Sequence, residues 1–217
     1  MTLRCLGTAL VLLILSAAAG VAATAQYNYL DGDSGQPWEA CAECHGVDGI
    51  SWSDRFPNMA AQNKAYMLAE MRHFRDGVRT NDDHQMFAVL SEMTPAQMDA
   101  AAAWYAAQPP APPVRADLAP AQRAWAKHLV QHGLGALHGC DACHDRNDYR
   151  GIAMPRIDGE RAGYLARELR DFSDGGRADD PHALMRRVVR VLKPDQIDVL
   201  AAYLASLPRK TQQGASP

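Results

Sequence analysis

The stretch Cys41-Ala42-Glu43-Cys44-His45 occurs again as Cys140-Asp141-Ala142-Cys143-His144. In a C-x-x-C-H run each thiol can form a thioether with a vinyl group of haem, and the adjoining imidazole can ligate the iron. A single C-x-x-C could instead be a redox thiol pair or half of a zinc site. A zinc site built from both copies would use all four thiolates and leave the two histidines without a role. The repeat therefore predicts two covalently bound haem c groups, held by Cys41, Cys44, His45, Cys140, Cys143 and His144.

The two halves of the chain repeat one another beyond these motifs. Residues 64–75 carry apolar side chains at helical spacing, and the apolar residues of 164–172 follow 98 residues later. Thr94 and Pro95 mark the start of a helix that is predicted to run to about residue 107. Residues 119–132 are predicted to form an amphipathic helix, and no stretch is predicted to be a strand. The predicted fold class is all-α, with two tandem domains that each wrap around one covalent haem.

Four segments are predicted along the chain. The first carries Arg4, an apolar run from Leu10 to Leu15 and an A-x-A site that ends at Ala25, the pattern of a cleaved secretory signal. An uncleaved membrane anchor is the alternative, because the uncharged segment approaches the length of a bilayer span. The proline-rich linker is predicted to be stiff and extended. The predicted segments are a signal peptide (1–25), a first domain (26–108), the linker (109–120) and a second domain (121–217).

Cysteine usage and charge indicate where the protein is located and what kind of partner it has. Cys5 lies in the predicted signal, so the four cysteines of the mature chain are all assigned to haem and none is left for a disulfide. Covalent haem attachment is coupled to export, which predicts a periplasmic location. Residues 26–108 hold 5 basic and 12 acidic residues, whereas residues 109–217 hold 16 basic and 13 acidic residues. This asymmetry predicts orientation of partners by charge, while the interleaved signs exclude nucleic acid as a partner.

The internal repeat also selects candidates for the sixth iron ligand. Met86 and Met185 each lie 41 residues after their motif histidine, His45 or His144. Other methionines of the first half correspond to non-methionine apolar residues in the second, which predicts that they belong to the core: Met59, Met67, Met71, Met93 and Met98. Met86 and Met185 are therefore the predicted axial ligands. His84 and His182 are the alternative, and ligation by two histidines would lower the reduction potential.

Two further pairs of residues are candidates for supporting roles. Pro57 and Pro155 follow the motif histidines by 12 and 11 residues, so a backbone carbonyl there could accept a hydrogen bond from the free ring N–H of each histidine. The alternative is that each proline only forms a turn. Arg79 and Arg177 could contact haem propionates, or could be ordinary solvated arginines.

With both motifs, the two Phe-x-x-Gly-x-Arg runs (74–79 and 172–177) and the paired methionines, the chain resembles the dihaem cytochrome c4 family. The resemblance implies two class I cytochrome c domains related by a pseudo-twofold axis, each with His/Met iron. It also implies a periplasmic shuttle, often membrane-associated, that delivers electrons to terminal oxidases. The chain departs from the family pattern after the second motif, where Asp145-Arg146-Asn147 replaces the usual Gly-x-Asp-Gly.

Iron that is closed on both faces by protein ligands favours outer-sphere electron transfer over catalysis. The predicted function is a periplasmic dihaem carrier, not an enzyme, that transfers electrons between respiratory partners. The alternative is an electron-accepting subunit of a dehydrogenase complex. A thiosulfate-oxidising cytochrome would need a cysteine ligand, and the mature chain has none to spare. The expected partners are redox proteins (an oxidase, a cytochrome bc1-type complex or a dehydrogenase), with peripheral or signal-anchored membrane association.

Overall fold

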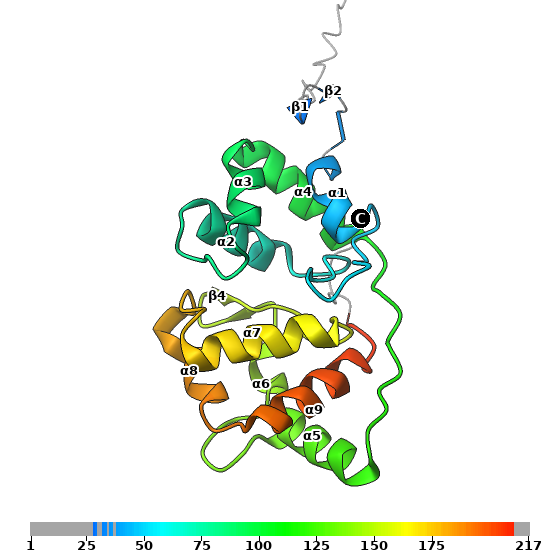
Figure 1. Cartoon of the computed structure of the whole chain (residues 1–217), viewed down its shortest axis with the longest axis vertical. Helices are drawn as coiled ribbons and strands as arrows, with labels where there is room; N and C mark the ends of the chain where they lie inside the picture. The colour runs from blue at the N-terminus through cyan, green and yellow to red at the C-terminus, as the bar shows by residue number, and fades with distance from the viewer. Residues whose placement is uncertain (1–27, 30–31, 34, 37, 211–217) are drawn as a thin grey trace, which may run out of the picture.

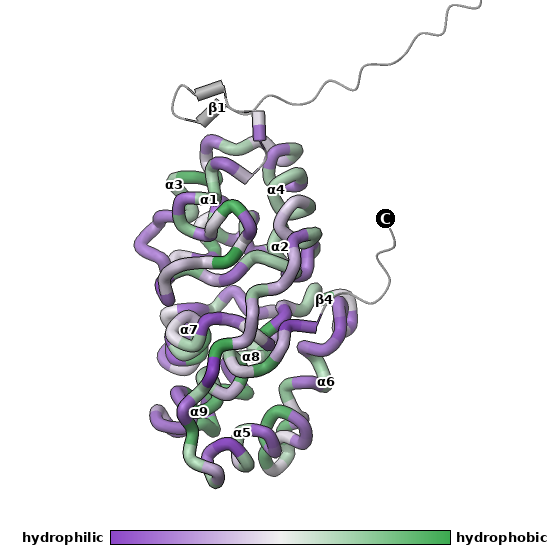
Figure 2. The backbone as a smooth tube through the Cα atoms, turned by 90° about the vertical axis from the view of Figure 1, so that its right-hand side faces the viewer, coloured by the Kyte–Doolittle hydropathy of each residue, from purple (hydrophilic) through white to green (hydrophobic). Residues whose placement is uncertain are grey.

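The chain folds into two helical halves that are stacked along the long axis of the molecule (Figure 1). This computed structural model describes residues 28–29, 32–33, 35–36 and 38–210, so the predicted signal peptide lies outside the described residues. From the side the halves remain one above the other (Figure 2). The upper half is called the first domain and the lower half the second domain.

The helices of the two domains follow the sequence repeat. The first domain contains α1 (Glu39–His45), α2 (Lys64–Arg75), α3 (Gln85–Ser91) and α4 (Pro95–Ala107). The second domain contains α5 (Pro120–His132), α6 (Asp141–His144), α7 (Ala162–Asp174), the short 3-10 helix η1 (Pro181–Ala183), α8 (Leu184–Val189) and α9 (Pro194–Ala205). The all-α prediction is confirmed.

Local signals in the sequence explain where α2 and α4 begin. The Asn63 side chain accepts hydrogen bonds from the backbone N–H groups of Ala65 and Tyr66, which would otherwise lack partners at the start of α2. Thr94 and Gln97 form a reciprocal capping box at the start of α4, with Pro95 in its first turn. Both helices therefore start where the sequence predicts.

Four two-residue strands correct the expectation that the chain has none. β1 (Asn28–Tyr29) pairs with β2 (Gly32–Asp33), and β3 (Asp148–Tyr149) pairs with β4 (Ile152–Ala153), both antiparallel. The turn between β3 and β4 places Arg150 and Gly151 at positive φ, as a two-residue hairpin requires. Strands this short carry no hydrophobic period, so they could not be recognised from the sequence pattern.

Each domain has its own hydrophobic core. The first core includes Met71, Phe74 and Tyr105, and the second includes Leu169 and Phe172. The linker between α4 and α5 runs along the outside of the second domain (Figure 1). It is attached there by the N–H of Val114, which donates to the Ala205 carbonyl at 3.0 Å. An extended linker is what its prolines predict.

Buried polar side chains join the two domains. The amide of Gln62 donates to the Arg156 carbonyl at 2.9 Å and accepts from the Arg156 N–H at 2.7 Å. The Asn63 amide, besides capping α2, donates to the carbonyls of Asn147 and Met154. Because these groups are buried, their hydrogen bonds must form between the domains or be lost. These hydrogen bonds therefore favour one relative position of the two domains.

Two arginines and two glutamates form the centre of this interface, and we call Glu70, Arg79, Glu168 and Arg177 the charge cluster. Glu70 and Glu168 are 98 residues apart, as are Arg79 and Arg177. Arg79 pairs with Glu70 of its own domain and with Glu168 across the interface at 2.8 Å. Arg177 pairs with Glu168 at 2.7 Å and with Glu70 across the interface at 2.6 Å. Reciprocal contacts of this kind are what a twofold relation between the domains generates.

The charge cluster neutralises itself. Burial alone would raise the pKa of Glu168, but Arg79 and Arg177 together hold that pKa below its ordinary value. Burial alone would lower the pKa of Arg177, but Glu70, Glu168 and other neighbours raise it. Arg79, Glu168 and Arg177 therefore stay charged at neutral pH, and each one depends on its partners in the cluster.

Replacing Glu168 with Gln should lower the free energy of unfolding of the holoprotein by about 3 kcal/mol or more, because two buried guanidinium groups lose a shared carboxylate. The measurement is denaturant unfolding followed by circular dichroism. Asp198→Asn is the matched control, since Asp198 pairs with Arg170 on the exposed surface, where such pairs contribute at most about 1 kcal/mol. Equal losses in the two variants would contradict the role given to the charge cluster.

Candidate haem sites

The two C-x-x-C-H motifs line one continuous cavity of about 820 Å³ that extends through both domains. Cys41, Cys44 and His45 line it from the first domain, and their counterparts Cys140, Cys143 and His144 line it from the second. The four residues of the charge cluster line the same cavity. Two sites that the sequence predicts separately are therefore joined across the domain interface.

Both motif histidines are held in an orientation suited to iron. Nδ1 of His45 lies 3.0 Å from the Pro57 carbonyl, and Nδ1 of His144 lies 3.0 Å from the Pro155 carbonyl. A carbonyl can only accept, so Nδ1 carries the proton and Nε2 keeps its lone pair. Nε2 of His45 is buried without a hydrogen-bond partner among the described residues. A buried nitrogen of this kind fits a metal ligand, and the predicted carbonyl contacts are confirmed.

Burial keeps these imidazoles neutral. The pKa of His45 and that of His144 are both lowered, mainly by burial, although the hydrogen bonds to Pro57 and Pro155 act in the opposite direction. A neutral imidazole is the form that binds iron.

The cysteines do not have the character of a redox thiol pair. Burial is the main cause that raises the pKa of Cys41 to about 12 and the pKa of Cys140 to about 12. Reactive and zinc-binding cysteines need a lowered pKa, because the thiolate is the nucleophile and the ligand. Burial therefore disfavours a reactive thiolate at Cys41 and at Cys140.

Met86 and Met185 occupy matching positions beside the cavity. Met86 lies in the first turn of α3 and its N–H donates to the Asp82 carboxylate at 2.7 Å, while Met185 lies in the first turn of α8. Both side chains are partly buried and line the cavity. Met67 and Met71 also line it from α2, but their counterparts in the second domain are leucines.

The alternative ligands His84 and His182 lie outside the large cavity. His84 and His182 are exposed, and each has a left-handed backbone conformation, with φ of 60° and 54°. Neither side chain lines the large cavity, although His182 lines a separate surface hollow. The two methionines therefore line the same cavity as the motif histidines, whereas these two histidines do not.

Arg79 and Arg177 differ from the solvated arginines that were one reading of the sequence. They are only 5% and 6% exposed, and they pair with Glu70 and Glu168 in the lining of the cavity. Neither glutamate was predicted as their partner. Their separation of 98 residues, the same as that of the arginines, was the available signal.

Known proteins of similar sequence cover most of the chain. It is 31% identical to cytochrome c4 of Pseudomonas aeruginosa, over 82% of this chain and 89% of that protein. It is 30% identical to the thiosulfate dehydrogenase electron acceptor of Stutzerimonas stutzeri, over 94% of each. No protein-family model matches the sequence.

Solved structures agree with this result. Reduced cytochrome c4 from Pseudomonas stutzeri matches with a TM-score of 0.67 and 27% identity, covering 77% of this chain and 93% of that one. A thiosulfate dehydrogenase from Marichromatium purpuratum also matches with a TM-score of 0.67, at 29% identity, but only 36% of that longer chain is covered.

Replacing Cys41 and Cys44 together with Ala should lower the haem content from two groups per chain to one, because one motif loses both attachment points. Replacing Cys140 and Cys143 should have the same effect. The measurement is the absorbance of the pyridine haemochrome relative to protein concentration. Two haems in either double variant would contradict the assignment.

The evidence for family membership comes from three levels. The sequence repeats a C-x-x-C-H motif, the fold stacks two helical domains around a shared cavity, and the similarity extends over most of the chain. Two covalently bound haem c groups and electron transfer follow from this similarity. The chain belongs to the dihaem cytochrome c4 family, whose members are c-type cytochromes with two class I domains in tandem.

Proposed function

We propose that this protein shuttles electrons in the periplasm between respiratory partners and delivers them to a terminal oxidase, with each iron held by one histidine and one methionine. The observation that carries the proposal is the matched placement of Met86 and Met185 beside the cavity that His45 and His144 also line. Each haem, when bound, supplies an iron that gains or loses one electron. Two such groups give the chain a capacity of two electrons.

The residues of the chain would prepare the site for outer-sphere transfer. His45 and His144 would bind from one side through Nε2, oriented by the carbonyls of Pro57 and Pro155. Met86 and Met185 would close the other side and leave no position for a substrate. Methionine as the second ligand raises the reduction potential relative to a second histidine. This arrangement supports a carrier rather than an enzyme.

The proposed segments are those of the sequence analysis: a signal at 1–25, domains at 26–108 and 121–217, and a linker at 109–120. The two hydrophobic cores fall within the two proposed domains. Among the described residues no helix has the length and apolar character needed to cross a membrane. The periplasmic location is supported by the predicted signal and by the export-coupled attachment of haem c.

The axial ligands can be tested by optical spectroscopy. The oxidised holoprotein should show the weak far-red absorption band of methionine–iron coordination, and replacing Met86 or Met185 with Ala should each remove about half of it, since axial-ligand identity governs the iron's electronic state. His84→Ala and His182→Ala are the matched controls and should leave the band unchanged. A band that survives both methionine replacements would refute His/Met ligation.

A second candidate function is an electron-accepting partner of a dehydrogenase. It is favoured by the similarity over 94% of both chains to a protein named as a thiosulfate dehydrogenase electron acceptor. The two candidates differ in how firmly the protein is bound to its donor. A subunit remains in a fixed complex, whereas a shuttle must dissociate from each partner.

Purification of a tagged copy from its native cells should distinguish the two candidates. A shuttle should elute alone at moderate salt, because transient redox complexes have small interfaces. Co-elution of a dehydrogenase in a constant ratio, through size-exclusion chromatography, would support the subunit instead. The tag belongs at the C-terminus, so that processing of the predicted signal does not remove it.

A further inference from the structure

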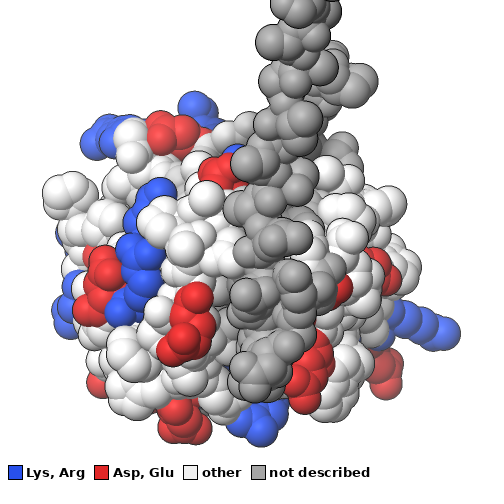
Figure 3. All heavy atoms as spheres, turned by 90° about the horizontal axis from the view of Figure 1, so that it is seen from above, with Lys and Arg blue, Asp and Glu red and all other residues white. Residues whose placement is uncertain are grey.

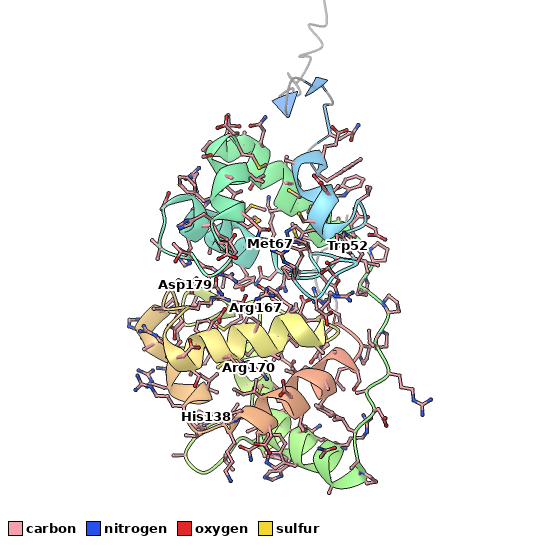
Figure 4. All side chains as sticks on the ribbon, in the orientation of Figure 1. Trp52, Met67, His138, Arg167, Arg170 and Asp179 are labelled. Carbon is pink, nitrogen blue, oxygen red and sulfur yellow. The ribbon has the colours of Figure 1, made fainter. Side chains whose placement is uncertain are left out.

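A small hollow of about 470 Å³ opens on the surface of the second domain beside α8. It is lined by His138, Tyr149, Arg150, Ile152, His182, Leu184 and Arg187. All of these except Arg150 and His182 also line the large cavity. In Figure 4, His138 lies on the same side of the second domain as α8. The hollow is therefore at the mouth of the second haem site.

The hollow has an apolar floor and a basic rim. Tyr149, Ile152 and Leu184 are partly buried, whereas Arg150 and Arg187 are exposed, as are the two histidines. No carboxylate is among its described lining residues. An apolar centre with a charged, solvated rim is the usual composition of a protein-binding surface.

Neither arginine of the rim has its charge neutralised. Arg187 donates to the His182 carbonyl at 2.7 Å, and the Arg150 guanidinium lies 5.3 Å from the centre of the Tyr149 ring. Within the part of the chain that the structure describes, neither forms an ion pair, in contrast to Arg186, which pairs with Asp180 at 2.7 Å. Arg190 is also exposed and follows Arg187 by three residues at the end of α8, so the two arginines lie on the same face of the helix. The charge of these arginines is directed at solvent.

The first domain lacks this basic surface. With Met86 matched to Met185, Ala88 and Ser91 stand where the second domain has Arg187 and Arg190, and α3 contains no Lys or Arg. Seen from above, the first-domain end carries both acidic and basic side chains among uncharged residues (Figure 3). The fold therefore does not require arginines at these positions.

We propose that the basic hollow beside the second haem site, with Arg150 and Arg187 on its rim and Arg190 on the same helix face as Arg187, docks a redox protein whose contact surface is acidic. This inference rests on the proposed electron-carrier function and names the chemistry of one partner. The occupant is a protein rather than a membrane, because the surface is concave with an apolar floor, whereas anionic lipid binding relies on larger groups of basic residues. Complementary charge would orient the partner toward the second haem and accelerate the encounter.

The test compares two double variants of the holoprotein that each lower the net charge by two. R187Q/R190Q removes charge from the basic hollow, and A88E/S91E adds negative charge at the matching positions of the first domain. The probe is an acidic blue-copper protein, and the rate constant of electron transfer to its oxidised form is measured by stopped flow over a series of salt concentrations. Binding is measured separately by calorimetry with both proteins reduced.

R187Q/R190Q should lower the rate constant at low salt about tenfold, weaken binding, and flatten the dependence on salt. A88E/S91E should change the rate by less than about twofold, because its charges lie away from the docking site. Equal losses in the two variants would overturn the proposal, since net charge alone would then explain them. A second outcome would also overturn the proposal. In it, R187Q/R190Q keeps the rate of the unmodified protein but no longer sediments with phosphatidylglycerol vesicles, which would identify the basic hollow as a membrane-binding surface.

Failure of docking can be told apart from failure of the carrier function. If R187Q/R190Q keeps the far-red band and transfers electrons as fast as the unmodified protein at every salt concentration, the docking proposal is wrong and the carrier stands. If the unmodified protein lacks the band and transfers no electrons to the probe, the carrier function is wrong and the docking proposal falls with it.

Discussion

Four charges between the domains, three of them buried, set the constraint on which the rest of the structure depends. A guanidinium or carboxylate removed from water must be neutralised by a partner, and here each arginine shares both glutamates with the other. A domain on its own could not pair its arginine fully, because one of the two carboxylates that each arginine contacts belongs to the other domain. In Figure 4 Asp179, which pairs with Arg177, also lies at this junction. The domains are therefore fixed relative to one another by electrostatics as well as by packing.

Because of this constraint the residues inside the molecule repeat between the two domains, whereas the surface residues can differ. The charge cluster, the histidine contacts to Pro57 and Pro155, and the two methionines repeat almost unchanged. The exposed residues of α3 and α8 do not repeat, because a side chain that faces solvent has no partner in the other domain. An internally symmetric protein can in this way present two different faces to its partners.

The sequence predicted what depends on local spacing. The motif cysteines and histidines follow from a five-residue pattern, and α2 follows from the period of Met67, Met71 and Phe74. α3 and α8 were not predicted, because each begins after residues in the left-handed conformation and the residue at its N-cap position makes no side-chain cap. The partnership of Glu70 with Arg177 was also missed, since it forms only when the domains meet and leaves no trace in the pattern of a single helix.

Arg209 links the end of the described chain to the first domain. Its guanidinium is buried, donates to the carbonyls of Asn58 and Ala60 at 3.1 Å, and pairs with Glu160 at 2.7 Å. Asn58 directly follows Pro57, whose carbonyl orients His45. The loop that supports the first histidine is therefore held in place by a side chain that follows the last helix of the second domain. A change in the second domain can in this way alter the environment of the first iron without touching any residue of the first domain.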